Sequence, residues 1–172
     1  MKRIVSILFI IAIASASANA QLNVKSSSSN EDIICKDMYC SVRSNNDGEY
    51  YLITVDKMQR TNATLTVFLG DDEESALLTL NDMFGWFDGA ENKSSLIITD
   101  TKSGEELTLY RVSQGTYIIT NGDAEYARHS YNQALTTALV GGVKQQNNSA
   151  SPILGYVTPK VLKKAISILS NL

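Results

Sequence analysis

His129 is the only histidine of the chain and the first residue to consider for chemistry. Glu125 and Tyr126 precede it by four and three residues, so the three side chains could share one face of a helix. A carboxylate beside an imidazole suits general acid–base catalysis. The same spacing is common in surface ion pairs, and the sequence shows no third ligand for a metal. His129, Glu125 and Tyr126 are therefore catalytic candidates, and we predict no metal site.

The compact motifs of common enzymes do not occur in this sequence. It has no G-x-S-x-G nucleophile elbow, no H-E-x-x-H, no P-loop and no G-x-G-x-x-G. Carboxylates can still converge from distant positions, as they do in glycosidases. A small hydrolase that uses carboxylates, with or without His129, therefore stays an alternative. No cofactor is predicted.

Two cysteines, Cys35 and Cys40, are separated by four intervening residues. A structural disulfide between them is the prediction for an exported protein. Two thiols alone are a poor zinc site, and a redox pair usually has the tighter C-x-x-C spacing. Free thiols are the alternative.

Three aromatic residues, Phe68, Tyr110 and Trp86, are candidates for binding. Phe68 and Tyr110 fall on strand faces that also carry threonine, which suggests exposure. An exposed aromatic row on a sheet could bind a peptide, a glycan or a protein. The alternative is that a layer of helix covers this face and buries the rings.

The first twenty residues have the pattern of a signal peptide. Lys2 and Arg3 precede an apolar run over 4–14, and small residues end in Ala18-Asn19-Ala20. The run is short for a membrane span, so we predict cleavage after Ala20 and no transmembrane segment in the mature chain. The protein is therefore expected to be exported, either secreted or periplasmic. Three sequons, at Asn62, Asn92 and Asn147, matter only in a eukaryotic source.

Charge and composition narrow the class of protein further. The formal net charge is −3 and becomes more negative when Lys2 and Arg3 leave with the leader. This argues against a general nucleic-acid binder, which needs a basic face. After the leader we expect a flexible Ser-rich arm over 21–32 and a single domain over 33–172.

The segment 70–89 is predicted to be the central packing helix. Its apolar residues recur at helical spacing, and the acidic run 71–74 is expected to cap the helix rather than bind a cation. Gly85 lies inside this pattern, where we expect it to let a strand approach closely. Gly89 is expected to end the helix in a left-handed conformation.

Strand patterns flank this helix on both sides. Strands are predicted over 39–43, 49–55, 63–69, 95–99, 106–112, 116–120 and 153–157, with further helices over 123–141 and 158–169. The fold class is therefore α+β, a mainly antiparallel sheet of five to seven strands packed by two or three amphipathic helices. A Gly-Asp-x-Glu junction precedes two of the helices, which a duplicated unit or ordinary helix capping would explain.

Export, one small domain and the missing catalytic motifs favour a non-catalytic binding protein. Its partner would be a protein or a glycan outside the cytoplasm, as for an inhibitor, an immunity protein or an envelope adaptor. The alternatives are the small extracytoplasmic hydrolase and a small-ligand carrier with an apolar pocket between helix and sheet.

Overall fold

The first four strands form one antiparallel sheet, here called sheet A. They are β1 (Asp32–Lys36), β2 (Cys40–Ser44), β3 (Tyr50–Val55) and β4 (Thr64–Gly70), and they pair in this order. The computed structural model describes residues 31–56, 63–113, 115–140 and 152–172. The predicted leader, most of the Ser-rich arm and the sequons at Asn62 and Asn147 lie outside these residues. β1 begins at Asp32, inside the range expected to be arm.

The remaining four strands form a second antiparallel sheet, sheet B. They are β5 (Ser95–Thr99), β6 (Glu106–Ser113), β7 (Thr116–Thr120) and β8 (Leu154–Val157), again paired in chain order. The α+β class is confirmed, but the single sheet of five to seven strands is wrong. The sheets separate between β4 and β5, because the intervening helix packs against β4 and does not bring β5 beside it.

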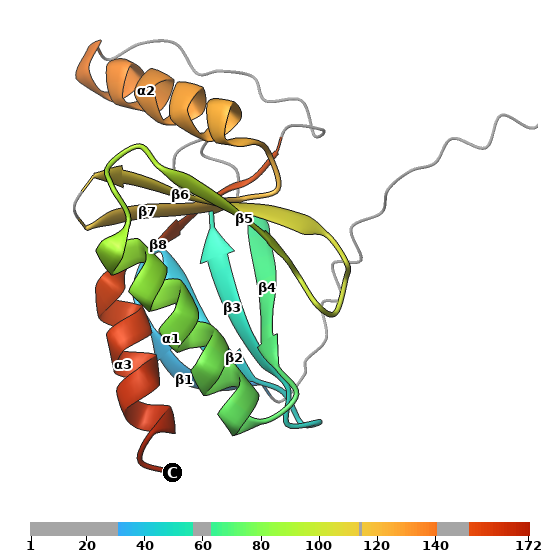
Figure 1. Cartoon of the computed structure of the whole chain (residues 1–172). Coiled ribbons are helices and arrows are strands. Elements are labelled where there is room, and N and C mark those ends of the chain that lie inside the picture. The colour runs from blue at the N-terminus through green and yellow to red at the C-terminus, as the bar shows by residue number, and fades with distance from the viewer. Residues whose placement is uncertain (1–30, 57–62, 114, 141–151) are drawn as a thin grey trace, which may run out of the picture.

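Three helices complete the fold: α1 (Glu73–Gly89), α2 (Ala124–Val140) and α3 (Pro159–Leu169). α1 and α3 lie side by side on one face of sheet A, with α1 over β3 and β4 and α3 over β1 and β2 (Figure 1). Sheet B lies across one end of this arrangement, and α2 covers its outer face (Figure 1).

The two sheets and α1 and α3 share one main core. Leu52, Leu80 and Phe87 are fully buried in it together with Ile119 of sheet B and Leu162 of α3. A smaller cluster lies between sheet B and α2 and contains Tyr110, Ile118, Ala127 and Leu154. The burial of Phe87 against Tyr117, with ring centroids 4.3 Å apart, ties the end of α1 to sheet B.

β8 crosses β3 at very close range and so joins the two sheets. A Cβ at Gly155 would lie 1.9 Å from Thr54 Oγ1, so only glycine fits at this crossing. Next to it, the amide of Leu154 donates to Asp56 Oδ2 at 3.1 Å. The chain therefore needs both a small residue and a carboxylate at the same junction.

The helix starts follow the predicted capping chemistry. Asp72 caps α1 by accepting from Ser75 N at 2.7 Å, and Asp123 accepts from Tyr126 N at the start of α2. Thr158 caps α3, with Pro159 in its first turn. The acidic run 71–74 is therefore a cap, as expected.

Two expectations about glycines of α1 are wrong. A Cβ at Gly85 would meet nothing within 4 Å, so no strand approaches it. α1 extends through Gly89, which is absent from the glycines with positive φ, and the helix ends at Ala90 in an extended conformation. Arg111 of β6 caps the C-terminal end of α1 instead, because its Nη1 donates to the carbonyls of Phe87 and Asp88 at 2.8 and 2.9 Å.

Cys35 and Cys40 are free and buried thiols, so the disulfide expected between them is not formed. Cys35 lies opposite Val42 in the β1–β2 pair, which makes Cys40 its diagonal neighbour. Diagonal neighbours are about 7–8 Å apart, more than a disulfide spans. Burial raises the pKa of both thiols, that of Cys40 to about 12.

In the part of the chain that the structure describes, none of the helices has the length and apolar character needed to cross a membrane.

Candidate functional site

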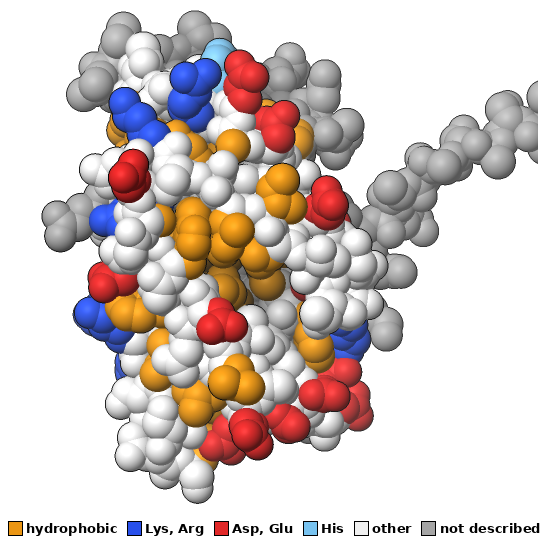
Figure 2. All heavy atoms as spheres, in the orientation of Figure 1, with side chains coloured by type: hydrophobic (Ala, Val, Ile, Leu, Met, Phe, Trp, Pro, Cys, Tyr) orange, Lys and Arg blue, Asp and Glu red, His pale blue; other side chains and the backbone are white. Residues whose placement is uncertain are grey.

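An apolar cleft opens between α1 and the facing edges of the two sheets. Its volume is about 220 Å³, and we call it the α1–β5 cleft. Its apolar wall consists of Val67, Phe68, Met83, Trp86, Leu96, Ile98 and Leu109. Figure 2 shows the hydrophobic side chains gathered around a hollow in the middle of the face in view.

One face of α1 forms the first wall of the cleft. Thr79, Met83 and Trp86 follow each other at steps of four and three residues, which places them on the same side of the helix. The caps at both ends of α1 hold this face in place. Gly70 is needed at the entrance to the helix, because a Cβ there would lie 2.2 Å from Ser75 Oγ.

β5 forms the opposite wall through alternate side chains. Leu96 and Ile98 lie opposite Leu109 and Leu107 of β6 and line the cleft side of sheet B. Ile97, between them, faces the other way and is 65% exposed. Thr99, the last residue of β5, also lines the cleft, whereas Ser95 and Ile97 do not.

Asp100 closes one end of the cleft and links the two sheets. Its Oδ2 accepts from the amide of Phe68 in β4 at 2.7 Å, and its Oδ1 accepts from the amides of Lys102 and Ser103. Burial would raise the pKa of this carboxyl, but the hydrogen bonds from Phe68 and Ser103 outweigh it and lower the pKa. Asp100 is therefore an ionised structural tie.

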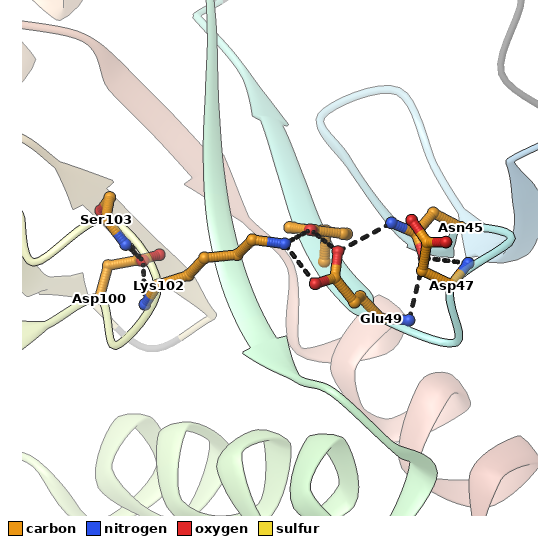
Figure 3. A network of polar contacts seen from close by, with 7 residues as sticks. Asn45, Asp47, Glu49, Asp100, Lys102 and Ser103 are labelled. Atoms are coloured by element: carbon orange, nitrogen blue, oxygen red, sulfur yellow. Dashed lines mark hydrogen bonds and ion pairs between the residues drawn. The ribbon is translucent and has the colours of Figure 1, made fainter.

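A second tie joins the same turn to sheet A. Lys102 Nζ pairs with the Glu49 carboxylate and donates to Tyr51 Oη at 2.7 Å, while Tyr51 Oη donates to Glu49 Oε2 at 2.5 Å (Figure 3). Asn45 Nδ2 donates to the same Glu49 oxygen at 2.9 Å. The Lys102 ammonium also lies 5.4 Å from the ring centroid of Phe68. The turn after β5 is thus held from two directions.

The protonation states in this network are unsuited to proton transfer at neutral pH. Hydrogen bonds from Lys102 and Tyr51 lower the pKa of Glu49 to about 2. The hydrogen bond to Glu49 raises the pKa of Lys102. Burial is the main cause that raises the pKa of Tyr51, and the hydrogen bond to Glu49 is the second. General acid–base catalysis needs a pKa near the working pH. The network therefore serves as an anchor for the turn.

The predicted catalytic candidates do not converge on a site. His129 is exposed in a shallow hollow on α2 that it shares with Arg128, and the hollow has no carboxylate in its lining. Glu125 lies 3.8 Å from Arg128 in an exposed ion pair, while Tyr126 donates to the carbonyl of Pro152 at 2.7 Å. Among the described residues, no group of three or more His, Cys, Asp and Glu side chains could hold a metal.

The three aromatic binding candidates separate into two places. Phe68 and Trp86 both line the α1–β5 cleft. Tyr110 is 3% exposed and lies beneath α2, beside Ile118 and Ala127. The helix layer considered as the alternative therefore covers Tyr110 but leaves the other two rings at the cleft.

Several residues that line the cleft were not among the site residues predicted from the sequence. The segment 95–99 was predicted to be a strand, but its three consecutive apolar residues gave no local sign of which of them line the cleft. Asp100 had no local sign at all, because its decisive contact is with Phe68, 32 residues away.

Comparisons with known proteins do not indicate what this site does. Neither protein-family models, nor curated proteins, nor solved structures give a match to this chain. The geometry of the cleft is therefore the main evidence for the function of this protein.

Proposed function

We propose that this protein is an exported, non-catalytic binding protein that accepts apolar side chains of a protein partner in the α1–β5 cleft. The observation that carries this proposal is the cleft itself, which is lined by aliphatic and aromatic side chains and open to solvent. Export is supported by the predicted signal peptide over residues 1–20.

The size and lining of the cleft favour a protein partner. Its volume of about 220 Å³ is below the ~300–1,000 Å³ of typical small-ligand pockets, so a small-ligand carrier is less well supported. Seven of the twelve lining residues are apolar, and the carboxylate of Asp100 is already occupied by backbone amides, so the lining favours an apolar side chain over a glycan. One or two apolar side chains, anchored as at other protein interfaces, suit this space.

The hydrolase alternative lacks a supporting arrangement. Asp82 and Asp100 are the carboxylates in the lining, and Asp100 is occupied by hydrogen bonds to backbone amides. His129 lies on α2, beyond sheet B from the cleft (Figure 1).

Trp86 provides a direct test, because it is the only tryptophan of the chain and lines the cleft. The mature protein, residues 21–172, would be used to select binders from a displayed library of random peptides. We expect the selected peptides to be rich in apolar residues and to shift the fluorescence emission of Trp86 on titration.

Variants of Leu96 locate the binding. Leu96→Asp places a charge in the cleft and Leu96→Trp fills it, so both should weaken peptide binding at least about tenfold. Ile33→Asp is the matched control, because Ile33 is 46% exposed on β1 at the far edge of sheet A. Circular dichroism would confirm that each variant is folded. Binding that neither Leu96 variant weakens, without a change in Trp86 emission, would refute the proposed function.

A further inference from the structure

Among the residues that the structure describes, no strand pairs with the outer edge of β5, and this edge differs from the other strand edges. Edge strands invite pairing with another chain, and proteins usually protect them. β1 has a β-bulge and charged residues, Asp32 and Lys36, at its two ends. β4 donates the amide of Phe68 to Asp100, and β8 is largely buried against sheet A.

β5 has none of these protections in the part of the chain that the structure describes. It is the outer strand of sheet B, and its sequence Ser-Leu-Ile-Ile-Thr has no charge, no proline and no bulge. Leu96 and Ile97 are 40% and 65% exposed. An exposed apolar edge of this kind is typical of a strand that pairs with another chain.

The direction of the main-chain groups fixes which residues would pair. The amide of Asp100 donates to the carbonyl of Glu105, so Asp100 is hydrogen-bonded toward the β6 side. Main-chain groups alternate in direction along an antiparallel strand. The N–H and C=O groups of Ser95, Ile97 and Thr99 therefore point to the free edge.

The sequence of β5 is nearly symmetric about Ile97. An antiparallel pair of two copies, with a two-fold axis at Ile97, places Ile97 opposite Ile97 of the second copy. In the same register Leu96 lies opposite Ile98, and Ser95 lies opposite Thr99. Every outward-directed residue then meets an outward-directed residue, like side chains face each other, and no charges of β5 are opposed.

We propose that two copies of this protein associate through β5, in the antiparallel register centred on Ile97, so that their two B sheets form one continuous sheet. Such an isologous contact closes on itself and gives a dimer, because each copy uses the same residues. The pairing uses the main chain of β5, whereas the α1–β5 cleft uses the side chains of Leu96 and Ile98. This association goes beyond the proposed function, because it joins one copy of the protein to a second copy through the main chain of β5.

Sedimentation equilibrium of the mature protein tests the association. A pair of five-residue strands buries less surface than a standard interface of about 1,600 Å², so we expect a weak dimer whose fraction grows with concentration. A protein that remains monomeric up to about 1 mM would overturn the inference.

A charge exchange at Ile97 tests the register. Ile97→Lys and Ile97→Glu each place like charges opposite each other on the two-fold axis, so each should raise the dimer dissociation constant at least about tenfold. An equimolar mixture of the two variants should recover association, because Lys then faces Glu. Lys and Glu variants at Ile33 on β1 are the control and should associate like the wild type, singly and mixed.

A crosslink gives an independent measurement that does not rely on charge. Residues of a hydrogen-bonded antiparallel pair have Cα atoms about 5.5 Å apart, within the range of a disulfide. Ile97→Cys should therefore form a covalent dimer on mild oxidation, whereas Leu78→Cys, exposed on α1, should not. A dimer that persists in both charge variants, or that crosslinks equally from Leu78, would overturn the assignment to β5. The peptide-binding assay with Leu96 variants is read separately, so failure of either proposal leaves the other intact.

Discussion

At the scale of single residues, the carboxylate of Asp100 is the group on which the closed end of the cleft depends. It accepts hydrogen bonds from Phe68 of sheet A and from the turn after β5 at the same time. We predict that Asp100→Asn lowers the free energy of unfolding at pH 7 by about 1–3 kcal/mol, since an amide has one acceptor oxygen for these donors. Urea unfolding measures this difference.

The same variant should change the pH dependence of stability. The folded pKa of Asp100 lies below the unfolded value of about 3.9, so its contribution is fully present above that pH and is lost as pH falls through the folded pKa. Wild-type stability should therefore decrease more steeply in this acid range than that of Asp100→Asn. Asp82→Asn, an exposed carboxylate of the same cleft, is the control and should be near neutral. Equal stability of Asp100→Asn and wild type at pH 7 would contradict this role.

Residue types alone predicted part of this site. Phe68 and Trp86 were candidates because large aromatic rings are common at interfaces, and both line the cleft. Tyr110 had the same local pattern, but α2 covers it. Whether an aromatic side chain is exposed depends on which helix packs over its strand face, and alternation along one strand does not contain that information.

At the scale of elements, α1 contains a helical glycine without a packing role. Gly85 is exposed, and a Cβ at this position would meet nothing within 4 Å. We predict that Gly85→Ala raises the free energy of unfolding by about 0.5–1 kcal/mol, because alanine restricts the unfolded chain and favours the helix. Thermal and urea unfolding measure the gain.

Gly70→Ala is the matched control for this substitution. At Gly70 a Cβ would lie 2.6 Å from the backbone nitrogen of Ala76, so the variant should be clearly less stable than wild type. A Gly85→Ala variant that loses stability would show that Gly85 does have a packing role in α1.

Local patterns predicted most elements but not all of them. Apolar spacing and capping residues located the three helices, and β-branched, aromatic or alternating residues between turns located seven of the strands, because these signals lie within one segment. β1 was missed because its bulge breaks the alternation and its ends carry Asp32 and Lys36. The disulfide expectation failed for a related reason, since the β1–β2 register places Cys35 and Cys40 diagonally.

At the scale of the whole molecule, two aspartates hold the sheets together. Asp56 follows the last residue of β3 and accepts from Leu154 of sheet B, while Asp100 follows the last residue of β5 and accepts from Phe68 of sheet A. The division into two sheets had no local signal, because it depends on these contacts between distant segments. The sequence therefore predicted the strands without predicting where the sheet divides.

The crossing of β8 over β3 allows a test of whether the two sheets unfold together. A Cβ at Gly155 would lie 1.9 Å from Thr54 Oγ1 and 3.2 Å from the carbonyl of Ile119, so it meets both sheets at once. We predict that Gly155→Ala lowers the free energy of unfolding by about 1–3 kcal/mol or more. Hydrogen exchange should show the loss of protection in both sheets, because the main core spans them. Gly89→Ala, with nothing within 4 Å of its Cβ, is the control and should not lose stability. Loss of protection in one sheet alone would mean that the sheets unfold independently and that their crossing does not hold the molecule together.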